Sequence, residues 1–474
     1  MTTHSATLRD GRTVAFVEVA DPPQGGMKRV YFSPDKSYVV AFFHDAAAAT
    51  DANRLARLEA VLTKFNPTTD PEVGKYWQTL FCWPSGIVAK PTLGIVAPAY
   101  PANFFFATGP FKGKEKKSNF FTGVKPRKYL PDAERGTLQT YVQIGIRLAR
   151  AVRRLHQAGL AHSDLSCNNV LIDPVTGQCV VIDIDSLVVP GMFAPDVLGT
   201  PNYVAPEVLA TMHLPVADPR RSHANARTDL HALAVLLYEY LLLRHPLVGP
   251  KIHPAASTEE QVSVEMGPGA LFIEHPSDAS NRRPDLVGTI ADLGPALSDL
   301  FLRSFVKGLH APNDRPAAIE WEKALVRTWD LLVPCGNPKC DRKGFVAGPA
   351  VKACPFCKTK LTAPVPTLKL RKEARPGQWV NDATLVVHGT TGLFGWHAFD
   401  NVYPGEKADR TRLGYFAFHQ GAWVLVNEKL DSLTSPGGSR VPPGSAVELK
   451  PGAAFRLSQG PNGRMAEVEF YTPQ

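Results

Sequence analysis

The sequence has no apolar run long enough to cross a bilayer. The longest candidate, LHALAVLLYEYLLL, is interrupted by Glu239 and falls short of the roughly 20 residues that a membrane span needs. A buried helix explains this stretch better. The first residues, MTTHSATLRDGR, are polar and show neither a signal peptide nor a lipidation pattern. We therefore expect a cytoplasmic protein.

Cysteine is scarce and unevenly placed. The chain has 7 cysteines, an odd number, and four of them fall within residues 335–357. This clustering favours a metal site over a disulfide framework. The remaining three are expected to be reduced thiols.

The composition describes a globular protein with more than one domain. A chain of 474 residues exceeds what one hydrophobic core supports, so two to four domains are expected. The apolar content of 44% and the charged content of 20% are ordinary, while 42 prolines and 37 glycines indicate many loops. The net charge of +8 permits a nucleic-acid partner, but the lysines gather mainly in FKGKEKKSNFF, which we interpret as a solvated loop. A basic nucleic-acid adaptor is thus the weakest hypothesis.

Strand-like segments come first and helical ones follow. The runs TVAFVEVA, KRVYFS and SYVVAFF alternate with turn-rich residues, and DANRLARLEAVLTKF then places Leu55, Leu58 and Leu62 at helical spacing. SGIVAK and TLGIVAPAY are two further strands. From LQTYVQIGIRLARAVRRLHQAG to about residue 330 the pattern is mostly helical. Residues 379–474 show short alternating runs without a long helix and predict an all-β module.

The loop AHSDLSCNNVLID carries polar groups suited to phosphoryl transfer. This reaction needs a carboxylate beside the attacking hydroxyl, oxygen ligands for magnesium, and cations on the phosphates. Asp164 can be the carboxylate and Asn169 a magnesium ligand. Asp183, at the end of the apolar strand VVIDIDS, is a second candidate ligand. The alternative is that Asp164 and Asn169 merely cap a turn.

Here the sequence resembles the protein kinase family, and the landmarks run in order over about 300 residues. Three motifs of the family have counterparts here: H-R-D-L-x-x-x-N at His162, Ser163, Asp164, Leu165 and Asn169, D-F-G at Asp183, Ile184 and Asp185, and A-P-E at Ala205, Pro206 and Glu207. Three single residues also match: Thr200 is the activation-segment threonine, Asp229 the aspartate of the buried helix, and Arg315 the arginine that pairs with the A-P-E glutamate. The resemblance implies an α+β, bilobal kinase fold, ATP and Mg²⁺ as cofactors, and a protein substrate.

The lysine that the family places on its third strand is absent. YVVAFF aligns Val40 and Ala41 with the family's V-A-x-K but has Phe43 in the lysine position. In GGMKRVYFS, Lys28 lies two residues before Val30, and residues two apart on a strand share a face. With-no-lysine kinases resemble this arrangement, so we expect Lys28 to bind the phosphates. Lys36 is the weaker candidate, and a solvated Lys28 would leave a pseudokinase scaffold.

The resemblance also implies the rest of a nucleotide site. Its expected residues are Gly25 and Gly26 in the glycine-rich turn, Lys28, Val30, Ala41, Glu59 as the partner of the lysine, and Ala97 and Tyr100 at the hinge. Glu59 could equally be a surface residue. Ser163 replaces the arginine that contacts a phosphorylated activation loop. Ser166 replaces a lysine near the γ-phosphate, and this second replacement leaves some transition-state stabilisation unaccounted for.

The segment FCWPSGIVA…LGIVAPAYP is similar to a subgroup of bacterial kinases.

The remaining motifs lie beyond the catalytic segments. CGNPKC…CPFC places Cys335, Cys340, Cys354 and Cys357 on two tight turns, which predicts a structural Zn²⁺ in a module that looks like a zinc ribbon. In the last hundred residues, a tryptophan, a strand, Asn427 and then a proline-glycine before the next strand follow one another in an order that resembles a forkhead-associated (FHA) β-sandwich. Only His397 and Asn427 loosely match that family's phosphothreonine-binding residues, and both are as easily structural.

We therefore predict five segments. They are a kinase N-lobe at 1–100, a C-lobe at 101–332, a zinc ribbon at 333–363, a linker at 364–378 and an FHA-like β-sandwich at 379–474. The first functional hypothesis is an ATP-dependent serine/threonine protein kinase, and the second is a pseudokinase scaffold. Similar bacterial kinases work beside a partner phosphatase and a von Willebrand-type protein, which the resemblance suggests as partners.

Overall fold

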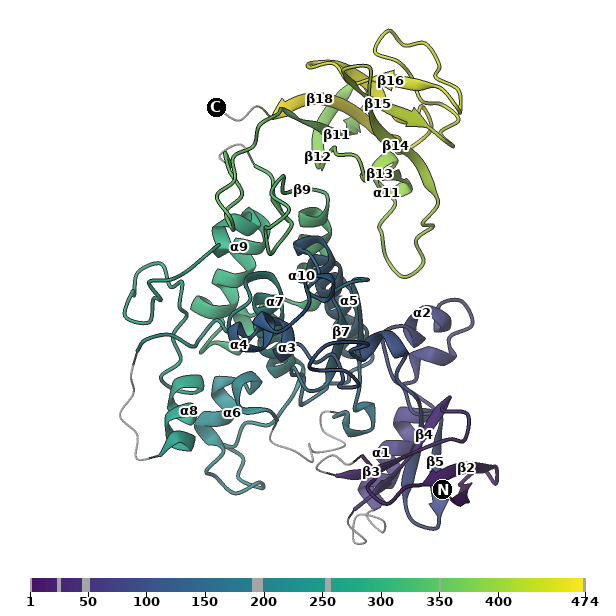
Figure 1. Cartoon of the computed structure of the whole chain (residues 1–474), viewed down its shortest axis with the longest axis vertical. Helices are drawn as coiled ribbons and strands as arrows, with labels where there is room; N and C mark the ends of the chain where they lie inside the picture. Colours follow the sequence, from purple (N-terminus) through teal and green to yellow (C-terminus); the bar gives the residue numbers. More distant parts are fainter. Residues whose placement is uncertain are drawn as a thin grey trace. The chain divides into compact units, whose positions relative to one another are not determined.

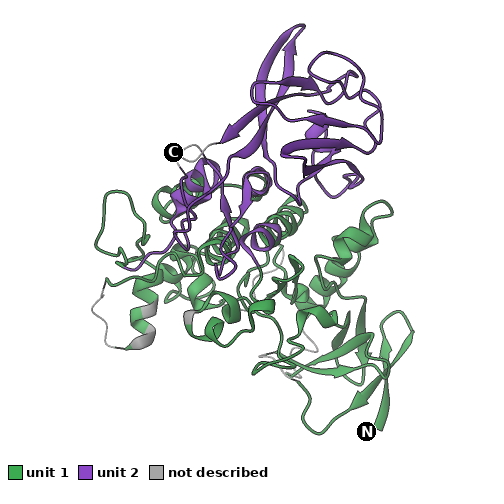
Figure 2. Ribbon diagram, turned by 45° about the horizontal axis from the view of Figure 1, so that its top comes forward, with its two compact units in different colours: residues 1–136, 144–284, 300–322 green, residues 137–143, 285–299, 323–474 purple. Residues whose placement is uncertain are grey.

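The computed structural model describes residues 2–23, 27–44, 52–189, 199–251, 257–348 and 351–471. The chain divides into two compact units, coloured separately in Figure 2. The first comprises Met1–Gly136, Ile144–Pro284 and Leu300–Glu322, and the second comprises Thr137–Gln143, Asp285–Asp299 and Lys323–Gln474. Three short segments that the sequence assigns to the C-lobe, 137–143, 285–299 and 323–332, thus cluster with the second unit.

The first unit begins with a six-stranded antiparallel sheet in the order β2-β1-β5-β6-β4-β3. Four of its strands, β2, β3, β4 and β5, are labelled in Figure 1. Its strands are β1 (Thr2–Leu8), β2 (Thr13–Glu18), β3 (Lys28–Phe32), β4 (Tyr38–Phe43), β5 (Gly86–Lys90) and β6 (Gly94–Pro98). Strand β1 was not expected from its polar sequence. Its first four residues are exposed, and only Ala6 and Leu8 enter the core.

The two faces of this sheet have different neighbours. One face buries Phe16, Val40 and Phe42 in a cluster of sheet residues. The other face buries Ala41 and Phe43 together with Leu58 of α1 (Ala52–Leu62), which confirms the predicted helix. Lys28 and Val30 alternate with Arg29, so both lie on the face that α1 covers. This face carries the candidate nucleotide-binding residues.

Helices make up most of the rest of the first unit, and three of them end or begin in the second. Their bounds are α2 (Gly74–Gln78), α3 (Asn119–Thr122), α4 (Val124–Lys128), α5 (Leu138–Gln157), α6 (Pro206–Thr211), α7 (Ala226–Leu242), α8 (Thr258–Met266), α9 (Pro295–Leu302) and α10 (Ala318–Trp329). Helix α7 is buried along nearly its whole length, and Asn225 caps its first turn through the backbone N–H of Arg227. None of the described helices combines the length and the apolar character that a membrane crossing requires.

The lysine run in FKGKEKKSNFF departs from the predicted solvated loop. The Nζ atom of Lys116 lies 2.8 Å from Glu134 Oε2 and 3.5 Å from Asp173 Oδ1, and Lys116 is buried. The backbone at Lys117 bridges Leu171 in the hairpin of β7 (Val170–Asp173) and β8 (Gln178–Val181), which draws the preceding lysine inward. The expectation of a fully solvated loop is therefore wrong at this lysine.

The second unit ends in two antiparallel four-stranded sheets with the orders β12-β11-β18-β17 and β13-β14-β15-β16. The strands of this unit are β9 (Leu332–Pro334), β10 (Gly344–Val346), β11 (Val365–Arg375), β12 (Gln378–Val386), β13 (Gly392–Phe394), β14 (Arg412–His419), β15 (Ala422–Asn427), β16 (Ala446–Glu448), β17 (Ala454–Arg456) and β18 (Met465–Tyr471), and its last helix is the single turn α11 (Gly395–Ala398). Leu368 and Leu370 of one sheet share a core with Phe416 and Leu425 of the other.

The segment interpreted as a linker is part of this fold. Strand β11 pairs with β12 on one side and with β18 on the other. Pro366, Leu368 and Leu370 are buried while their neighbours are less so, as expected for a strand with one face on a core. The proline and the many basic residues hid this alternation in the sequence.

Candidate active site

The polar loop at 161–173 is fixed by an aspartate from the buried helix α7. Asp229 accepts hydrogen bonds from the backbone N–H of His162 (2.7 Å) and of Ser163 (3.2 Å). The buried ring of His162 in turn donates from Nε2 to the carbonyl oxygen of Ile182 at 2.9 Å. The loop is thus tied both to α7 and to the segment that carries Asp183.

Asp164 and Asn169 lie next to each other at the end of this loop. The amide Nδ2 of Asn169 donates to the backbone oxygen and to Oδ2 of Asp164, both at 2.8 Å. Thr200 donates to Asp164 Oδ1 from its backbone N–H (2.7 Å) and from Oγ1 (2.9 Å). A carboxylate offers about four lone-pair sites, so one remains for a substrate hydroxyl. The amide oxygen of Asn169 is the atom left to bind a metal.

Asp183 begins a tight turn after the strand β8. Its backbone has the left-handed conformation, with φ 61°, and the single-turn helix η5 (Ile184–Ser186) follows. Aspartate adopts this conformation more readily than most residues. The hydroxyl of Ser186 donates to the carbonyl oxygen of Asp183 at 2.9 Å. The turn brings Asp183 and Asp185 close to the same partner.

That partner is Lys28 from β3. Its Nζ lies 2.8 Å from Asp183 Oδ1 and 2.7 Å from each carboxylate oxygen of Asp185. Burial alone would lower the pKa of Lys28, but the attraction of Asp185 and Asp183 outweighs it and raises that pKa. The Lys28 ammonium in turn holds the pKa of Asp183 below its usual value, against the effect of burial. Lys28 is therefore charged and lies beside Asp183, a candidate metal ligand.

Phe43, at the position where the family has its lysine, lies directly across the sheet from Lys28. The two residues are register partners in the antiparallel pair of β3 and β4. The Nζ of Lys28 is 5.8 Å from the centre of the Phe43 ring. Lys36, the weaker candidate, is exposed in the turn after β3 and far along the sheet from this pair.

Glu59 does not take the position expected of it. Its Oε1 lies 3.2 Å from Nη2 of Arg9, and both side chains are about half exposed. Among the described residues, the carboxylates that pair with Lys28 are those of Asp183 and Asp185. The predicted ion pair between Glu59 and Lys28 is therefore corrected. Helix α1 is oriented by its buried apolar residues, which leaves Glu59 on its solvent side.

The other expected nucleotide-site residues surround the same cleft face. Val30 and Ala41 are register partners and pack in one cluster. Ala97 is buried in β6, and Tyr100 packs with Leu171 of β7, where burial raises its pKa. Gly25 and Gly26 lie outside the residues that the structure describes.

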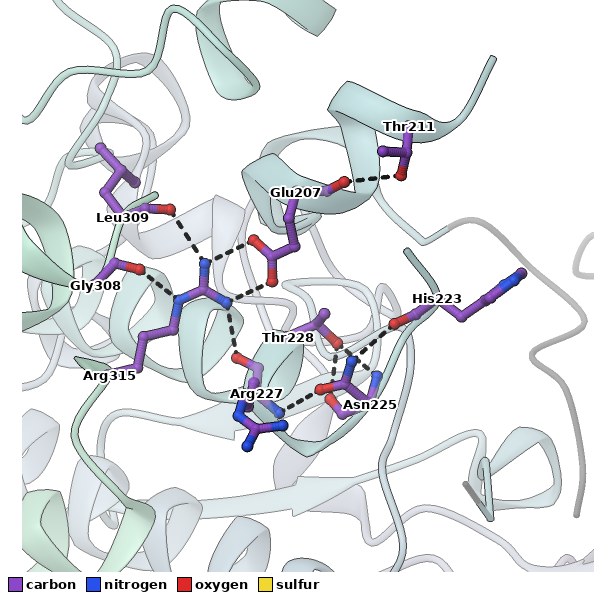
Figure 3. Close-up of polar contacts among 9 residues, drawn as sticks. All are labelled: Glu207, Thr211, His223, Asn225, Arg227, Thr228, Gly308, Leu309 and Arg315. Atoms are coloured by element: carbon purple, nitrogen blue, oxygen red, sulfur yellow. Dashed lines mark hydrogen bonds and ion pairs between the residues drawn. The ribbon is translucent and has the colours of Figure 1, made fainter. Parts of the chain in front are cut away.

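Glu207 and Arg315 form a bidentate ion pair in which the arginine is buried and the glutamate partly buried (Figure 3). The two guanidinium nitrogens of Arg315 lie 2.8 and 2.7 Å from the two carboxylate oxygens of Glu207. Arg315 also donates to the carbonyl oxygens of Gly308, Leu309 and Arg227. The pair anchors the start of α6, six residues after Thr200, and so supports the segment that contacts Asp164.

The four clustered cysteines converge in the second unit. Their sulfur atoms all lie within 4.8 Å of one another. The Sγ atoms of Cys335 and Cys357 are 3.5 Å apart and those of Cys340 and Cys354 are 3.9 Å apart. Tetrahedral zinc with Zn–S bonds of about 2.3 Å separates its sulfurs by about 3.8 Å, so this donor set fits the ion.

His397 and Asn427 are engaged in internal hydrogen bonds. Nδ1 of His397 accepts from the backbone N–H of Phe394, and its Nε2 lies 3.2 Å from Asp330 Oδ1. The fully buried side chain of Asn427 donates to two backbone carbonyl oxygens and accepts from the N–H of Leu430. Both residues therefore have structural partners and neither is placed to bind a phosphopeptide.

Comparisons with known proteins agree with this geometry. Residues 120–296 match the family model described as protein kinase domain. The serine/threonine-protein kinase pkn3 of Myxococcus xanthus is 28% identical over 255 residues, which cover 52% of this chain and 38% of that protein. The serine/threonine-protein kinase PknD of Chlamydia felis is 30% identical over 154 residues, which cover 27% and 15%. Residues 120–296 are a protein kinase domain.

The kinase domain match covers Asp164, Asn169 and Asp183, but it begins after Lys28. A protein kinase domain implies ATP and Mg²⁺ as cofactors. The chain spans less than two fifths of the length of the two curated relatives. A solved kinase domain of a Toxoplasma gondii rhoptry antigen covers 69% of this chain and 86% of its own, at 14% identity and a TM-score of 0.42, too low to add to the assignment.

Two contributors to the kinase site were missed or undervalued in the sequence. Asp185 was read only as a replacement for the family's glycine, although it binds Lys28 through both oxygens. The direct contact of Thr200 with Asp164 bridges 36 residues and could not be read from spacing. The one available signal was the pattern Asp-x-Asp after an apolar strand, which places two carboxylates on one short turn.

Proposed function

We propose that this chain is an active ATP-dependent serine/threonine protein kinase whose phosphate-binding lysine is Lys28. The observation that carries the proposal is the position of Lys28 Nζ, within 2.8 Å of Asp183, the candidate metal ligand. The matched domain begins after residue 28, so the role of Lys28 rests on this geometry and not on the family match.

Each residue of the site has a distinct task in the proposed reaction. Asp164 accepts the proton of the substrate hydroxyl while that oxygen bonds to the γ-phosphorus of ATP and the bond to the ADP oxygen breaks. Thr200 and Asn169 hold the two oxygens of Asp164 in place. Magnesium, when bound by Asp183 and Asn169, would neutralise charge on the phosphates. Lys28 supplies the positive charge on the side of the N-terminal sheet.

Hydroxyls take the place of two basic residues in this site. Ser166, at the position of the family's catalytic-loop lysine, has its Oγ 3.1 Å from Thr200 Oγ1 and donates to it, because the hydroxyl hydrogen of Thr200 is given to Asp164. Ser163, at the position of the arginine that reads a phosphorylated activation loop, has its backbone held by Asp229. These substitutions support activity without that phosphorylation switch, and they increase the share of charge stabilisation that falls on Lys28.

The test compares two lysine variants of the full chain. Lys28→Ala should reduce magnesium-dependent transfer from radiolabelled ATP, to the chain itself or to a generic protein substrate, by about a hundredfold or more. Lys36→Ala, an exposed lysine eight residues away, should retain wild-type transfer. Equal activity of the two variants would show that the relocation is wrong. Nucleotide binding without any transfer in the wild type would favour the pseudokinase scaffold.

We also propose that residues 333–363 form a structural zinc ribbon. The sulfur separations suit tetrahedral zinc, and the four thiolates leave no open coordination position. This site would hold the surrounding turns together and present a surface for packing or for a partner. A nucleic-acid role would instead require affinity that falls steeply with added salt.

The two sheets after the ribbon support a β-sandwich similar to FHA domains, because they share one core. The internal hydrogen bonds of His397 and Asn427 argue against a phosphothreonine pocket built on them. By resemblance to bacterial kinases, the proposed partners are a phosphatase and a von Willebrand-type protein.

A further inference from the structure

We propose that Asp185 is the residue that positions Lys28 for the nucleotide, the task that the sequence assigned to Glu59. This inference rests on the proposed function and names a specific part of it. It concerns the turn after β8, where two carboxylates, Asp183 and Asp185, meet one ammonium group.

The two aspartates contact Lys28 differently. Asp185 places both carboxylate oxygens 2.7 Å from Nζ, whereas Asp183 offers one oxygen at 2.8 Å. The side chain of Asp185 is 5% exposed and that of Asp183 is 36% exposed. Asp185 therefore contacts the lysine from the protein interior, and Asp183 contacts it from the more solvent-exposed side.

Because of this difference in exposure, we assign metal binding to Asp183 and the lysine contact to Asp185. An exposed carboxylate can exchange a lysine contact for a metal ion and its waters, as magnesium sites require. A buried carboxylate has no water to replace its partner, so it keeps the lysine. Asp185 can therefore hold Lys28 when magnesium takes over Asp183.

The rival positioning residue is occupied elsewhere. Glu59 pairs with Arg9 at 3.2 Å, and both side chains are about half exposed. An exposed pair of this kind contributes little to the position of either group. Glu59 thus has neither the contact nor the burial that Asp185 has.

A consequence for metal binding follows. Without the charge of Asp185, Lys28 would rely on Asp183 as its carboxylate partner and would compete with magnesium for it. Asp185→Asn should therefore raise the magnesium concentration needed for half-maximal transfer by about tenfold, because the Lys28 ammonium then competes with magnesium for the carboxylate of Asp183. Glu59→Gln should keep the wild-type requirement. Asp185→Glu, which restores the charge on a longer arm, should recover part of the lost affinity.

The decisive measurement is a double-mutant cycle on the magnesium dependence of ADP binding, with Lys28→Met, Asp185→Asn and the combination. If Asp185 acts through Lys28, the double variant should require the same magnesium as Lys28→Met alone. Additive effects would mean that Asp185 binds metal or supports the fold independently, and the inference would be wrong. A wild-type requirement in Asp185→Asn, or a raised one in Glu59→Gln, would also overturn it.

The outcomes separate this inference from the proposed function. If Asp185→Asn fails to fold while the combination with Lys28→Met folds, the two charges depend on each other, which supports the inference. Full transfer by Lys28→Ala would defeat the proposed function itself. Loss of transfer in Lys28→Ala together with a wild-type magnesium requirement in Asp185→Asn would defeat the inference alone.

Discussion

The ion pair between Glu207 and Arg315 gives a prediction whose size the structure sets. The guanidinium side chain is 1% exposed and the carboxylate 23% exposed, and two short contacts join them. Glu207→Gln keeps the shape and one acceptor but removes the charge. The backbone carbonyl oxygens of Gly308, Leu309 and Arg227 still accept from Arg315 (Figure 3).

The expected cost lies between two limits. Breaking a buried pair outright costs about 3–5 kcal/mol, while a single hydrogen bond to a charged group contributes about 1.5–3 kcal/mol. Because most contacts of Arg315 survive, we expect Glu207→Gln to lower the local stability of α6 by about 2–3 kcal/mol. The matched control is Glu320→Gln, whose carboxylate is 41% exposed and pairs with Arg303 at 2.6 Å. That change should cost less than about 1 kcal/mol.

Native-state hydrogen exchange measures both changes in the folded full chain. The amides of α6 should exchange about 30- to 150-fold faster in Glu207→Gln, because 1.4 kcal/mol corresponds to about a tenfold change. The first turn of α10, which Glu320 caps through the N–H of Ala317, should change far less in Glu320→Gln. Equal acceleration at both sites would refute the argument from burial.

Two further predictions concern a buried acid and the cysteine cluster. Burial raises the pKa of Glu239 to about 8 despite the hydrogen bond from Tyr203, so between pH 4.5 and 8 the folded state holds a proton that the unfolded state releases. The free energy of unfolding should therefore fall as pH rises through this window, by at most about 1.4 kcal/mol per pH unit, and Glu239→Gln should lack this pH dependence in urea denaturation.

Denatured protein should release one zinc per chain to a chromogenic chelator. Cys357→Ser should release far less zinc and should become protease-sensitive within residues 333–363. Full-chain protein purified without chelator that holds no zinc would contradict the ribbon.

Much of the catalytic loop could be predicted because its groups are close in sequence. The kinase motif predicted that Asp164 and Asn169 belong to one site, and the structure joins them by hydrogen bonds. The expectation for Lys28 combined strand alternation, since residues two apart share a face, with the resemblance to with-no-lysine kinases. These inferences needed only the local geometry of each segment and the order of the family's motifs.

The misplaced residues depended on packing between distant segments. Glu59 shares a helix with Leu58, and it is the fit of Leu58 into the sheet core that turns Glu59 away from the cleft. Lys116 looked like part of a solvated run, but its partner Glu134 comes from a later loop. Strand β11 likewise needed β18, a hundred residues on, to become a central strand. A sequence pattern indicates which face of a helix or strand is buried, but the residues that contact it come from distant segments that only the fold brings together.

The register of β3 and β4 is compatible with the role proposed for Lys28. Lys28 on β3 is the direct register partner of Phe43 on β4, the position where the resemblance places the family's lysine. Neighbouring strands lie about 4.8 Å apart, which is less than the reach of a lysine side chain. The ammonium group can therefore come to the same phosphates from the neighbouring strand.

A lysine on β3 extends from a different strand than a lysine on β4 would, so a different carboxylate lies next to its ammonium group. A lysine on β4 would extend from a strand that packs against α1, the helix that carries Glu59. From the edge strand β3, Lys28 meets the turn after β8 instead, where Asp185 is buried. A glycine at position 185 would leave this ammonium with Asp183 as its carboxylate partner, in direct competition with magnesium. In the proposed site, Lys28 and Asp185 therefore act together, because both carboxylate oxygens of Asp185 contact the Lys28 ammonium.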